Sequence, residues 1–219
     1  MEESFIKELK VQKYFFNIIQ YKNSLNLLDI LLEKGKDHPD VKDERIPYWL
    51  EIWPSAFVLA SHLLERNIIK PGLRSLEIGC GIGIPSMICK KMGGVPHLTD
   101  YTVEALEFCK KNWALNFNDP ISISKMDWRE PDENLKAPLL LASDVAYERR
   151  NFDYLVKAFK KLVSSDGMII FSEPDRNVAI SFIESLPFHG FLIEAFNYKG
   201  FFEGNPYNVN VFELKITTK

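Results

Sequence analysis

The sequence predicts an α/β fold: a three-layer αβα sandwich around a seven-stranded, mostly parallel sheet that ends in an antiparallel strand pair. Two observations support this prediction. From residue 46 onward, short apolar runs alternate with stretches of helical periodicity, which is typical of a parallel sheet with helices on both faces. Near the end of the chain, the apolar segments 191–198 and 209–216 follow one another without a helix between them, which indicates two antiparallel neighbours.

The first 45 residues differ in composition from the remainder, and we expect them to form a small N-terminal extension to a domain that spans residues 46–219. Apolar residues crowd positions 14–19 and 25–32 around a turn-like Lys-Asn-Ser at 22–24. This pattern fits either a β-hairpin or two short helices, and we favour the hairpin.

The remaining elements follow from the spacing of apolar residues and from turn signals. The helix expected over 85–92, for example, has Pro85 in its first turn and is followed by Gly93 and Gly94, which suits a helix start and end. In chain order, the expected helices are 56–65, 85–92, 103–117, 152–163 and 178–186. The expected strands are 75–78, 97–99, 121–124, 139–142, 168–172, 191–198 and 209–216.

Composition and charge exclude several classes of protein. With 219 residues, 46% of them hydrophobic, and a formal net charge of −3, the chain suits one folded domain whose main partner is not a nucleic acid. Cys80, Cys89 and Cys109 form no C-x-x-C pair, so neither a disulfide framework nor a zinc site is indicated, and no metal is expected. The polar N-terminus and the lack of an apolar run of about 18 residues predict no membrane segment and a cytoplasmic location.

A glycine-rich turn follows the strand expected over 75–78, with glycines at 79, 81 and 83. Such turns let a nucleotide-like cofactor approach the backbone and the next helix N-terminus. The dinucleotide spacing G-x-G-x-x-G is not matched, because position 84 is Ile. Glu77 precedes the turn; its carboxylate would repel a pyrophosphate but could face a cationic amine. Gly79, Gly81 and Gly83 with Glu77 therefore favour S-adenosylmethionine over a dinucleotide, although a turn without any ligand is the simpler alternative.

Two further acidic positions suit the same cofactor. Asp100 ends the next strand, 21 residues after Gly79, near the spacing of about 20 residues at which a carboxylate meets ribose hydroxyls. It could also cap the following helix, and that role does not exclude the first. Asp127 follows the third strand, where its side chain could accept a hydrogen bond from an adenine amino group while Trp128 covers the ring. An ordinary loop aspartate beside a core tryptophan is the alternative.

The sequence resembles the class I S-adenosylmethionine-dependent methyltransferases, whose fold is Rossmann-like. Residues 76–85, Leu-Glu-Ile-Gly-Cys-Gly-Ile-Gly-Ile-Pro, are similar to their first motif. Within that group the chain most resembles family 16, the protein-lysine methyltransferases, in three segments: Pro-Tyr-Trp-Leu-Glu-Ile-Trp-Pro at 47–54, Asp-Trp at 127–128 and the D-x-x-Y sequence at 144–147. Residues 47–54 and Glu-Pro-Asp-Arg at 173–176 are most similar to the branch that methylates the electron-transfer flavoprotein beta subunit.

The resemblance implies a protein-lysine N-methyltransferase that uses S-adenosyl-L-methionine. Asp144 would attract and orient the ammonium group of the substrate lysine, and Tyr147 would form an aromatic wall or a hydrogen-bond partner for it. Trp53 would cover the methionine end of the cofactor, and Ser143 would join the cofactor-binding residues. Each of these residues has a purely structural alternative: a core position for Tyr147, a helix cap for Asp144 and a hydrophobic staple for Trp53.

Two other functions stay open at this point. The first is a small-molecule N- or O-methyltransferase with the same cofactor site. The second is a cofactor-binding interaction module without catalysis, which the intact segment 144–147 disfavours. Glu173 and Asp175 could add negative potential for a cationic substrate, but we expect them to lie in a solvated loop.

Overall fold

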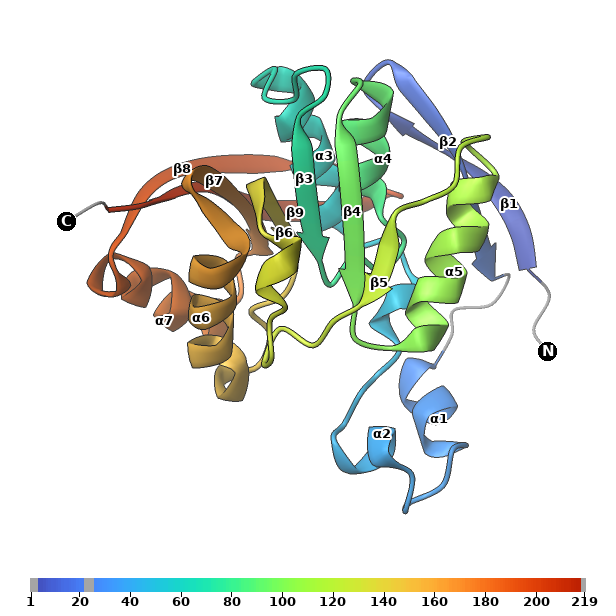
Figure 1. Ribbon diagram of the computed structural model, residues 1–219. Coiled ribbons are helices and arrows are strands. Elements are labelled where there is room, and N and C mark those ends of the chain that lie inside the picture. The colour runs from blue at the N-terminus through green and yellow to red at the C-terminus, as the bar shows by residue number, and fades with distance from the viewer. Residues whose placement is uncertain (1–3, 22–25, 218–219) are drawn as a thin grey trace.

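The computed structural model describes residues 4–21 and 26–217. Within these residues the chain forms a seven-stranded sheet with the order β5-β4-β3-β6-β7-β9-β8 and a separate two-stranded hairpin, β1-β2 (Figure 1). Neighbours from β5 to β7 are parallel, whereas β9 is antiparallel to both β7 and β8. The predicted seven-stranded α/β sandwich with a C-terminal antiparallel pair is therefore confirmed.

The strands are β1 (Ser4–Val11), β2 (Tyr14–Tyr21), β3 (Arg74–Ile78), β4 (Val95–Asp100), β5 (Ile123–Lys125), β6 (Ala137–Ser143), β7 (Val163–Pro174), β8 (Phe191–Phe202) and β9 (Asn205–Ile216). The α-helices are α1 (Leu27–Leu32), α2 (Pro39–Lys42), α3 (Pro54–Glu65), α4 (Ile84–Lys91), α5 (Val103–Ala114), α6 (Phe152–Leu162) and α7 (Asn177–Ser185). Short 3₁₀ helices span Tyr48–Leu50, Glu133–Leu135, Arg149–Asn151 and Leu186–His189.

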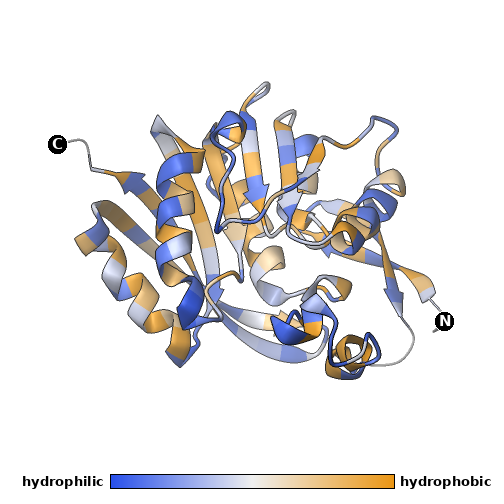
Figure 2. Ribbon diagram, turned by 60° about the horizontal axis from the view of Figure 1, so that its bottom comes forward, coloured by the Kyte–Doolittle hydropathy of each residue, from blue (hydrophilic) through white to orange (hydrophobic). Residues whose placement is uncertain are grey.

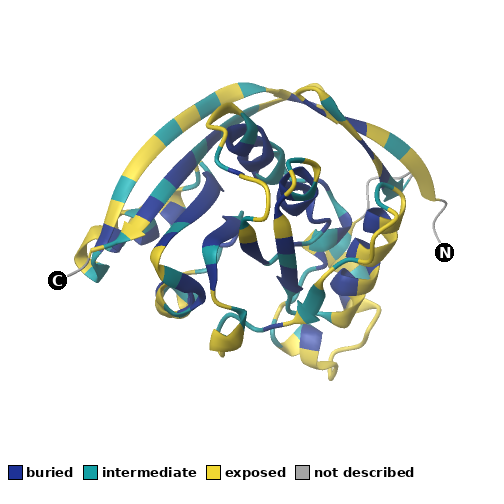
Figure 3. Cartoon of the chain, turned by 45° about the horizontal axis from the view of Figure 1, so that its top comes forward, coloured by how far each residue is buried: buried dark blue, intermediate teal, exposed yellow. Residues whose placement is uncertain are grey.

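The core has two halves, one on each face of the sheet, and Figure 2 shows the apolar strands between the helical layers. Alternating side chains of β6 go to opposite halves: Leu139 and Leu141 pack with α3, α4 and α5, whereas Leu140 and Ala142 pack with α6 and α7. Burial of both faces explains why the central strands are continuous apolar runs. Figure 3 shows the same strands as the buried interior of the molecule.

The N-terminal hairpin is present, but with a different partner strand from the one expected. The segment Tyr14–Tyr21 pairs with Ser4–Val11, and not with residues 25–32. Residues 27–32 instead form α1, whose N-cap Asn26 accepts a hydrogen bond from the Asp29 amide. The expected turn at 22–24 lies outside the described residues. The missed signal in the sequence was the alternation of apolar and polar residues at 9–11, where Leu9 and Val11 are buried and Lys10 is exposed.

Several strands are longer than predicted. β7 includes residues 165–167, which lie between the predicted helix 152–163 and the predicted strand 168–172, and the register between β6 and β7 shifts there. β8 and β9 continue through residues 199–208, between the two predicted strands, and reverse only at Glu203-Gly204, where both residues have positive φ. β8 and β9 are each twelve residues long and pair with one another, so both strands are longer than the predicted segments 191–198 and 209–216.

Candidate active site

A cavity of about 450 Å³ lies where β3, β4 and β6 end, which is the edge of an α/β sheet at which ligands usually bind. Figure 1 shows α1 and α2 beyond these strand ends. The expected site residues that line the cavity are Trp53, Gly79, Gly81, Gly83, Asp100, Asp127, Trp128, Ser143, Asp144 and Tyr147. The fold thus brings together residues from five separate segments of the chain, and Glu77 is the expected site residue that it leaves out.

The glycine turn adopts a conformation that side chains would obstruct. Gly79 has φ +60°, and a Cβ atom there would lie 2.9 Å from Cζ3 of Trp128, so the indole packs directly on the turn. Gly83 has φ +83°, and its Cβ would lie 2.6 Å from Cδ2 of Leu98. Both positions therefore need glycine, for backbone conformation and for close packing. The turn forms one wall of the cavity.

Asp100 fixes this turn to the end of β4. Its Oδ2 accepts a hydrogen bond of 3.0 Å from the Gly81 amide, and its Oδ1 accepts one of 2.7 Å from the Tyr101 amide. Burial raises the pKa of Asp100, and the amide hydrogen bonds oppose that shift. The carboxylate thus holds the turn while it also lines the cavity, where the expected ribose would lie.

The structure corrects the expectation that Glu77 faces a cofactor amine. Glu77 is buried inside β3, and its Oε2 accepts a hydrogen bond of 3.0 Å from the Ser86 amide in the first turn of α4. Alternation along the strand turns this side chain toward α4, away from the cavity. Burial raises the pKa of Glu77 to about 8. Its contact with α4 supports the helix start behind the glycine turn.

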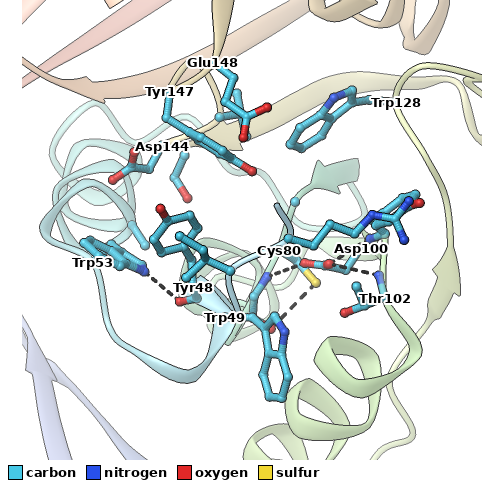
Figure 4. Close-up of a pocket in the computed structure, with 18 of the residues that line it drawn as sticks. Tyr48, Trp49, Trp53, Cys80, Asp100, Thr102, Trp128, Asp144, Tyr147 and Glu148 are labelled. Atoms are coloured by element: carbon cyan, nitrogen blue, oxygen red, sulfur yellow. Dashed lines mark hydrogen bonds between the residues drawn. The ribbon is translucent and has the colours of Figure 1, made fainter. Parts of the chain in front are cut away.

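Asp127 lines the cavity, but its carboxylate already has a partner. Arg129 donates from Nε and Nη2 to Asp127 Oδ2 at 2.9 and 2.7 Å, and the Arg129 amide donates to Oδ1 at 2.9 Å. The expected hydrogen bond to an adenine amino group would have to share these oxygens. Trp128 packs beside Gly79 and lines the cavity (Figure 4), and its role as a cover for an adenine ring stays a prediction.

Residues before position 46 also reach the cavity, although the sequence did not indicate any role for them. Asp43 pairs with Arg129 at 3.4 Å, and its carbonyl accepts a hydrogen bond of 2.9 Å from Arg150. The guanidinium of Arg45 lies 4.1 Å from the ring centre of Tyr101, which directly follows Asp100. These contacts connect the N-terminal segment to three loops at the rim of the cavity.

An aromatic cluster lines the opposite wall. Trp53 Nε1 donates a hydrogen bond of 2.7 Å to the Tyr48 carbonyl, as Figure 4 shows, and the two rings meet edge to face at 5.7 Å. The Tyr48 ring also lies 5.6 Å from the ring of Tyr147. Burial raises the pKa of Tyr147, so its phenol is neutral near pH 7. Tyr48 was not expected as a site residue, although it lies in the quoted 47–54 segment.

Asp144 also lines the cavity and follows β6 with φ +57°. Its amide donates to the Ser172 carbonyl at 2.8 Å, and this bond secures the left-handed conformation at the strand end. The Asp144 side chain is 11% exposed and forms an ion pair with Nη2 of Arg176, a cavity residue that the sequence interpretation overlooked. Its Oδ2 has no hydrogen-bond partner among the described residues.

Glu173 was expected in a solvated loop, and that expectation is wrong. Its side chain is fully buried at the end of β7, and Oε2 accepts a hydrogen bond of 3.2 Å from the Ala146 amide. Burial raises the pKa of Glu173 to about 8. The pairing of β7 with both β6 and β9 encloses this position, whereas Asp175, two residues later, is exposed as expected.

Two other features are absent from the described residues. No group of three or more His, Cys, Asp or Glu side chains there could hold a metal ion. In the same part of the chain, no helix is both long and apolar enough to cross a membrane.

Solved structures share this fold. Precorrin-6y C5,15-methyltransferase from Geobacter metallireducens superposes with a TM-score of 0.59 at 15% identity, covering 74% of this chain and 87% of that one. The glycopeptide N-methyltransferase MtfA, complexed with sinefungin, gives a TM-score of 0.59 at 10% identity and covers 72% and 92%. At these identities the likeness concerns the fold alone.

Curated relatives are similar in sequence over part of their length. Histone-arginine methyltransferase METTL23 from Rattus norvegicus is 27% identical over 145 residues, which are 61% of this chain and 64% of the relative. Histidine protein methyltransferase 1 homolog from Dictyostelium discoideum is 29% identical over 53% of this chain and 40% of the relative. Protein N-lysine methyltransferase METTL21A from Danio rerio is 27% identical over 55% and 58%. The chain thus spans less than two thirds of the length of these relatives.

The sequence pattern of one protein family matches more than half of the chain, over residues 45–187, and that family is described as lysine methyltransferase. The match includes the glycine turn and the segment from Asp144 to Tyr147, which carried the resemblance noted in the sequence. The narrower likeness to the electron-transfer flavoprotein branch stays a prediction. The chain belongs to the lysine methyltransferase family.

Proposed function

We propose that this protein is an S-adenosylmethionine-dependent protein-lysine N-methyltransferase. The observation that carries the proposal is the position of Asp144 and Tyr147, which line the same cavity as the glycine turn. Membership of the lysine methyltransferase family supports the reaction type. The names of the relatives, which describe methylation of protein arginine, histidine and lysine, support a protein acceptor over a small molecule.

The cavity has the features that S-adenosylmethionine needs. Its volume of about 450 Å³ falls within the usual range for small-ligand pockets, and glycines leave the backbone of the turn accessible. Asp100 would meet the ribose hydroxyls, Trp128 the adenine ring and Trp53 the methionine end, with Ser143 nearby. When bound, S-adenosylmethionine supplies an electrophilic methyl group on a sulfonium.

The protein's own contribution is to bind and orient the acceptor in a dry site. A lysine side chain has an ordinary pKa of about 10.4 and arrives protonated, whereas only the neutral amine is a nucleophile. Asp144 would bind and orient this ammonium, and the released proton would go to Asp144 or to water. The rings of Tyr48 and Tyr147, whose centres lie 5.6 Å apart, would form the aromatic walls that exclude water and contact the alkyl chain.

The test is methyl transfer in extract from the source organism. Purified protein is incubated with extract and S-adenosylmethionine that carries a labelled methyl group, and mass spectrometry locates the label. The proposal expects a labelled lysine in a protein, and labelling of that lysine lower by about ten-fold or more when Asp144→Asn replaces the wild type. Label that appears only in small molecules would contradict the protein acceptor.

A protein-arginine acceptor is a second candidate, because one observation favours it. The guanidinium of Arg176 already pairs with Asp144 inside the cavity, so the acceptor corner accommodates an arginine side chain. The same mass spectra separate the two candidates, since they identify the labelled residue.

A cytoplasmic location is also part of the proposal. It rests on the three cysteines, which show no disulfide pattern.

A further inference from the structure

Arg176 occupies the position where a cationic acceptor would be expected. Its Nη2 forms an ion pair with Oδ1 of Asp144 and lies 3.5 Å from Oε1 of Glu173. Arg176 lines the cavity, and its side chain is 37% exposed. Asp144, which should attract the positive charge of the substrate, is therefore already paired with a cationic side chain of the same protein.

The two carboxyl groups around Arg176 are incompletely satisfied. Oδ2 of Asp144 and Oε1 of Glu173 are buried and make no hydrogen bond with the described residues. Because Oδ2 of Asp144 has no hydrogen-bond partner among the described residues, Arg176 does not form with this carboxylate the two-pronged contact that makes arginine-carboxylate pairs strong. An ammonium group has three donors and could serve Oδ1 and Oδ2 of Asp144 and Oε1 of Glu173 better.

The local backbone also gives Arg176 little support. It is the N-cap residue of α7 and makes no side-chain capping bond. A cation at a helix N-terminus is opposed by the helix dipole, because that end carries partial positive charge. Burial lowers the pKa of Arg176, which means that the charged form gains little from its surroundings. The ion pair with Asp144 is thus the main contact that keeps this guanidinium inside the cavity.

We propose that Arg176 is an internal occupant of the acceptor site, which the cationic side chain of the substrate displaces from the Asp144–Glu173 pair before methyl transfer. This inference rests on the proposed function and adds a specificity device to it. A neutral substrate side chain cannot replace the positive charge of Arg176 beside Asp144 and Glu173, so Arg176 stays in the acceptor site. A cationic substrate side chain of the right length replaces the Arg176–Asp144 ion pair with its own ion pair to Asp144 and thereby enters the site.

The experiment uses the full chain saturated with S-adenosylhomocysteine, and n-butylammonium as a probe for the end of a lysine side chain. Binding is followed by NMR of protein labelled with ¹⁵N-arginine, and the Arg176 Nε signal is assigned from its loss in Arg176→Ala. 1-Butanol is the neutral probe of the same length. Arg176→Lys keeps the charge, and Arg74→Ala removes an exposed arginine at the opposite end of β3.

If Arg176 is an internal competitor, its removal increases the fraction of protein that is ready to bind, and Arg176→Ala binds butylammonium about five-fold more tightly than wild type. Arg176→Lys and Arg74→Ala remain near the wild-type affinity. In wild type, butylammonium shifts the Arg176 signal to that of a solvent-exposed arginine, and 1-butanol leaves it unchanged.

Equal or weaker binding to Arg176→Ala, binding to neither protein, or an Arg176 signal that does not move would each overturn the proposal. These results differ from a failure of the proposed function. If S-adenosylhomocysteine itself does not bind wild type, the cofactor assignment fails. If it binds and butylammonium affinity is independent of Arg176, only the displacement is refuted.

Discussion

Replacement of Glu77 by glutamine should change the pH dependence of stability by an amount that follows from its burial. Burial raises the pKa of Glu77 from its ordinary 4.5 to about 8. Between these values the folded protein keeps a proton that the unfolded chain has released, so the free energy of unfolding falls as pH rises. The contribution is fully present below about pH 4.5 and is lost as pH passes about 8, a change of at most about 5 kcal/mol.

The measurement is urea unfolding of wild type and Glu77→Gln at several pH values between about 5 and 7.5. Subtraction of the two curves cancels the contributions of all other groups, among them Glu173, whose pKa burial also raises to about 8. The variant should gain about 1.4 kcal/mol relative to wild type for each pH unit. Its absolute stability can be lower, because a buried amide nitrogen needs an acceptor. Parallel curves would refute a protonated, buried Glu77.

Three other substitutions test different parts of the structure. Gly83→Ala would place Cβ 2.6 Å from Leu98 in a backbone with φ +83°, so urea unfolding should show a loss of about 1 to 3 kcal/mol, and an unchanged midpoint would contradict this packing. Asp144→Asn keeps a residue that tolerates φ +57°; methyl transfer should fall by about ten-fold or more, while calorimetry should show S-adenosylhomocysteine affinity within about two-fold. A variant that transfers methyl groups at the wild-type rate would remove the Asp144 carboxylate from the reaction. Asn112→Ala removes the acceptor of the Ile19 amide at 2.7 Å, so hydrogen exchange at that amide should accelerate by about ten-fold, and unchanged exchange would mean that other contacts hold the hairpin.

The cofactor half of the site could be predicted from the sequence because its signals are local. The glycines at 79, 81 and 83 must adopt positive φ within five residues, and Asp100 follows at a fixed spacing. Both lie where expected. Glu77 was misinterpreted because its distance from the turn was considered without the alternation of its strand, which directs the side chain toward α4.

The acceptor half was predicted only in part, since its contacts join distant elements. Asp144 and Tyr147 stood out as a short motif, but the pairing of Asp144 with Arg176 depends on how β6 and β7 align. Burial of Glu173 depends on β9 as well, which is far along the chain. The residues next to Asp144 and Glu173 in the sequence do not indicate that these carboxyl groups are buried, because charged residues after a strand usually face solvent.

The N-terminal hairpin illustrates the same limit for the fold. The segment 14–21 had a strand pattern, but the choice between partners on either side depends on packing against α5. Asn112 of α5 and Asn116, which follows that helix, accept hydrogen bonds from the amides of Ile19 and Asn17, and these contacts bind the hairpin to the domain. The sequence alone predicts the strand, whereas its pairing partner depends on contacts with residues that are distant in the chain.

The most direct test of the central claim is calorimetric titration of the full chain with S-adenosylhomocysteine. The account predicts binding to one site in wild type and in Arg74→Ala, and loss of binding in Gly81→Arg, because Gly81 lines the cavity and a long side chain there would fill it. Absence of binding to wild type, or binding of NAD in its place, would contradict the assignment of the cavity.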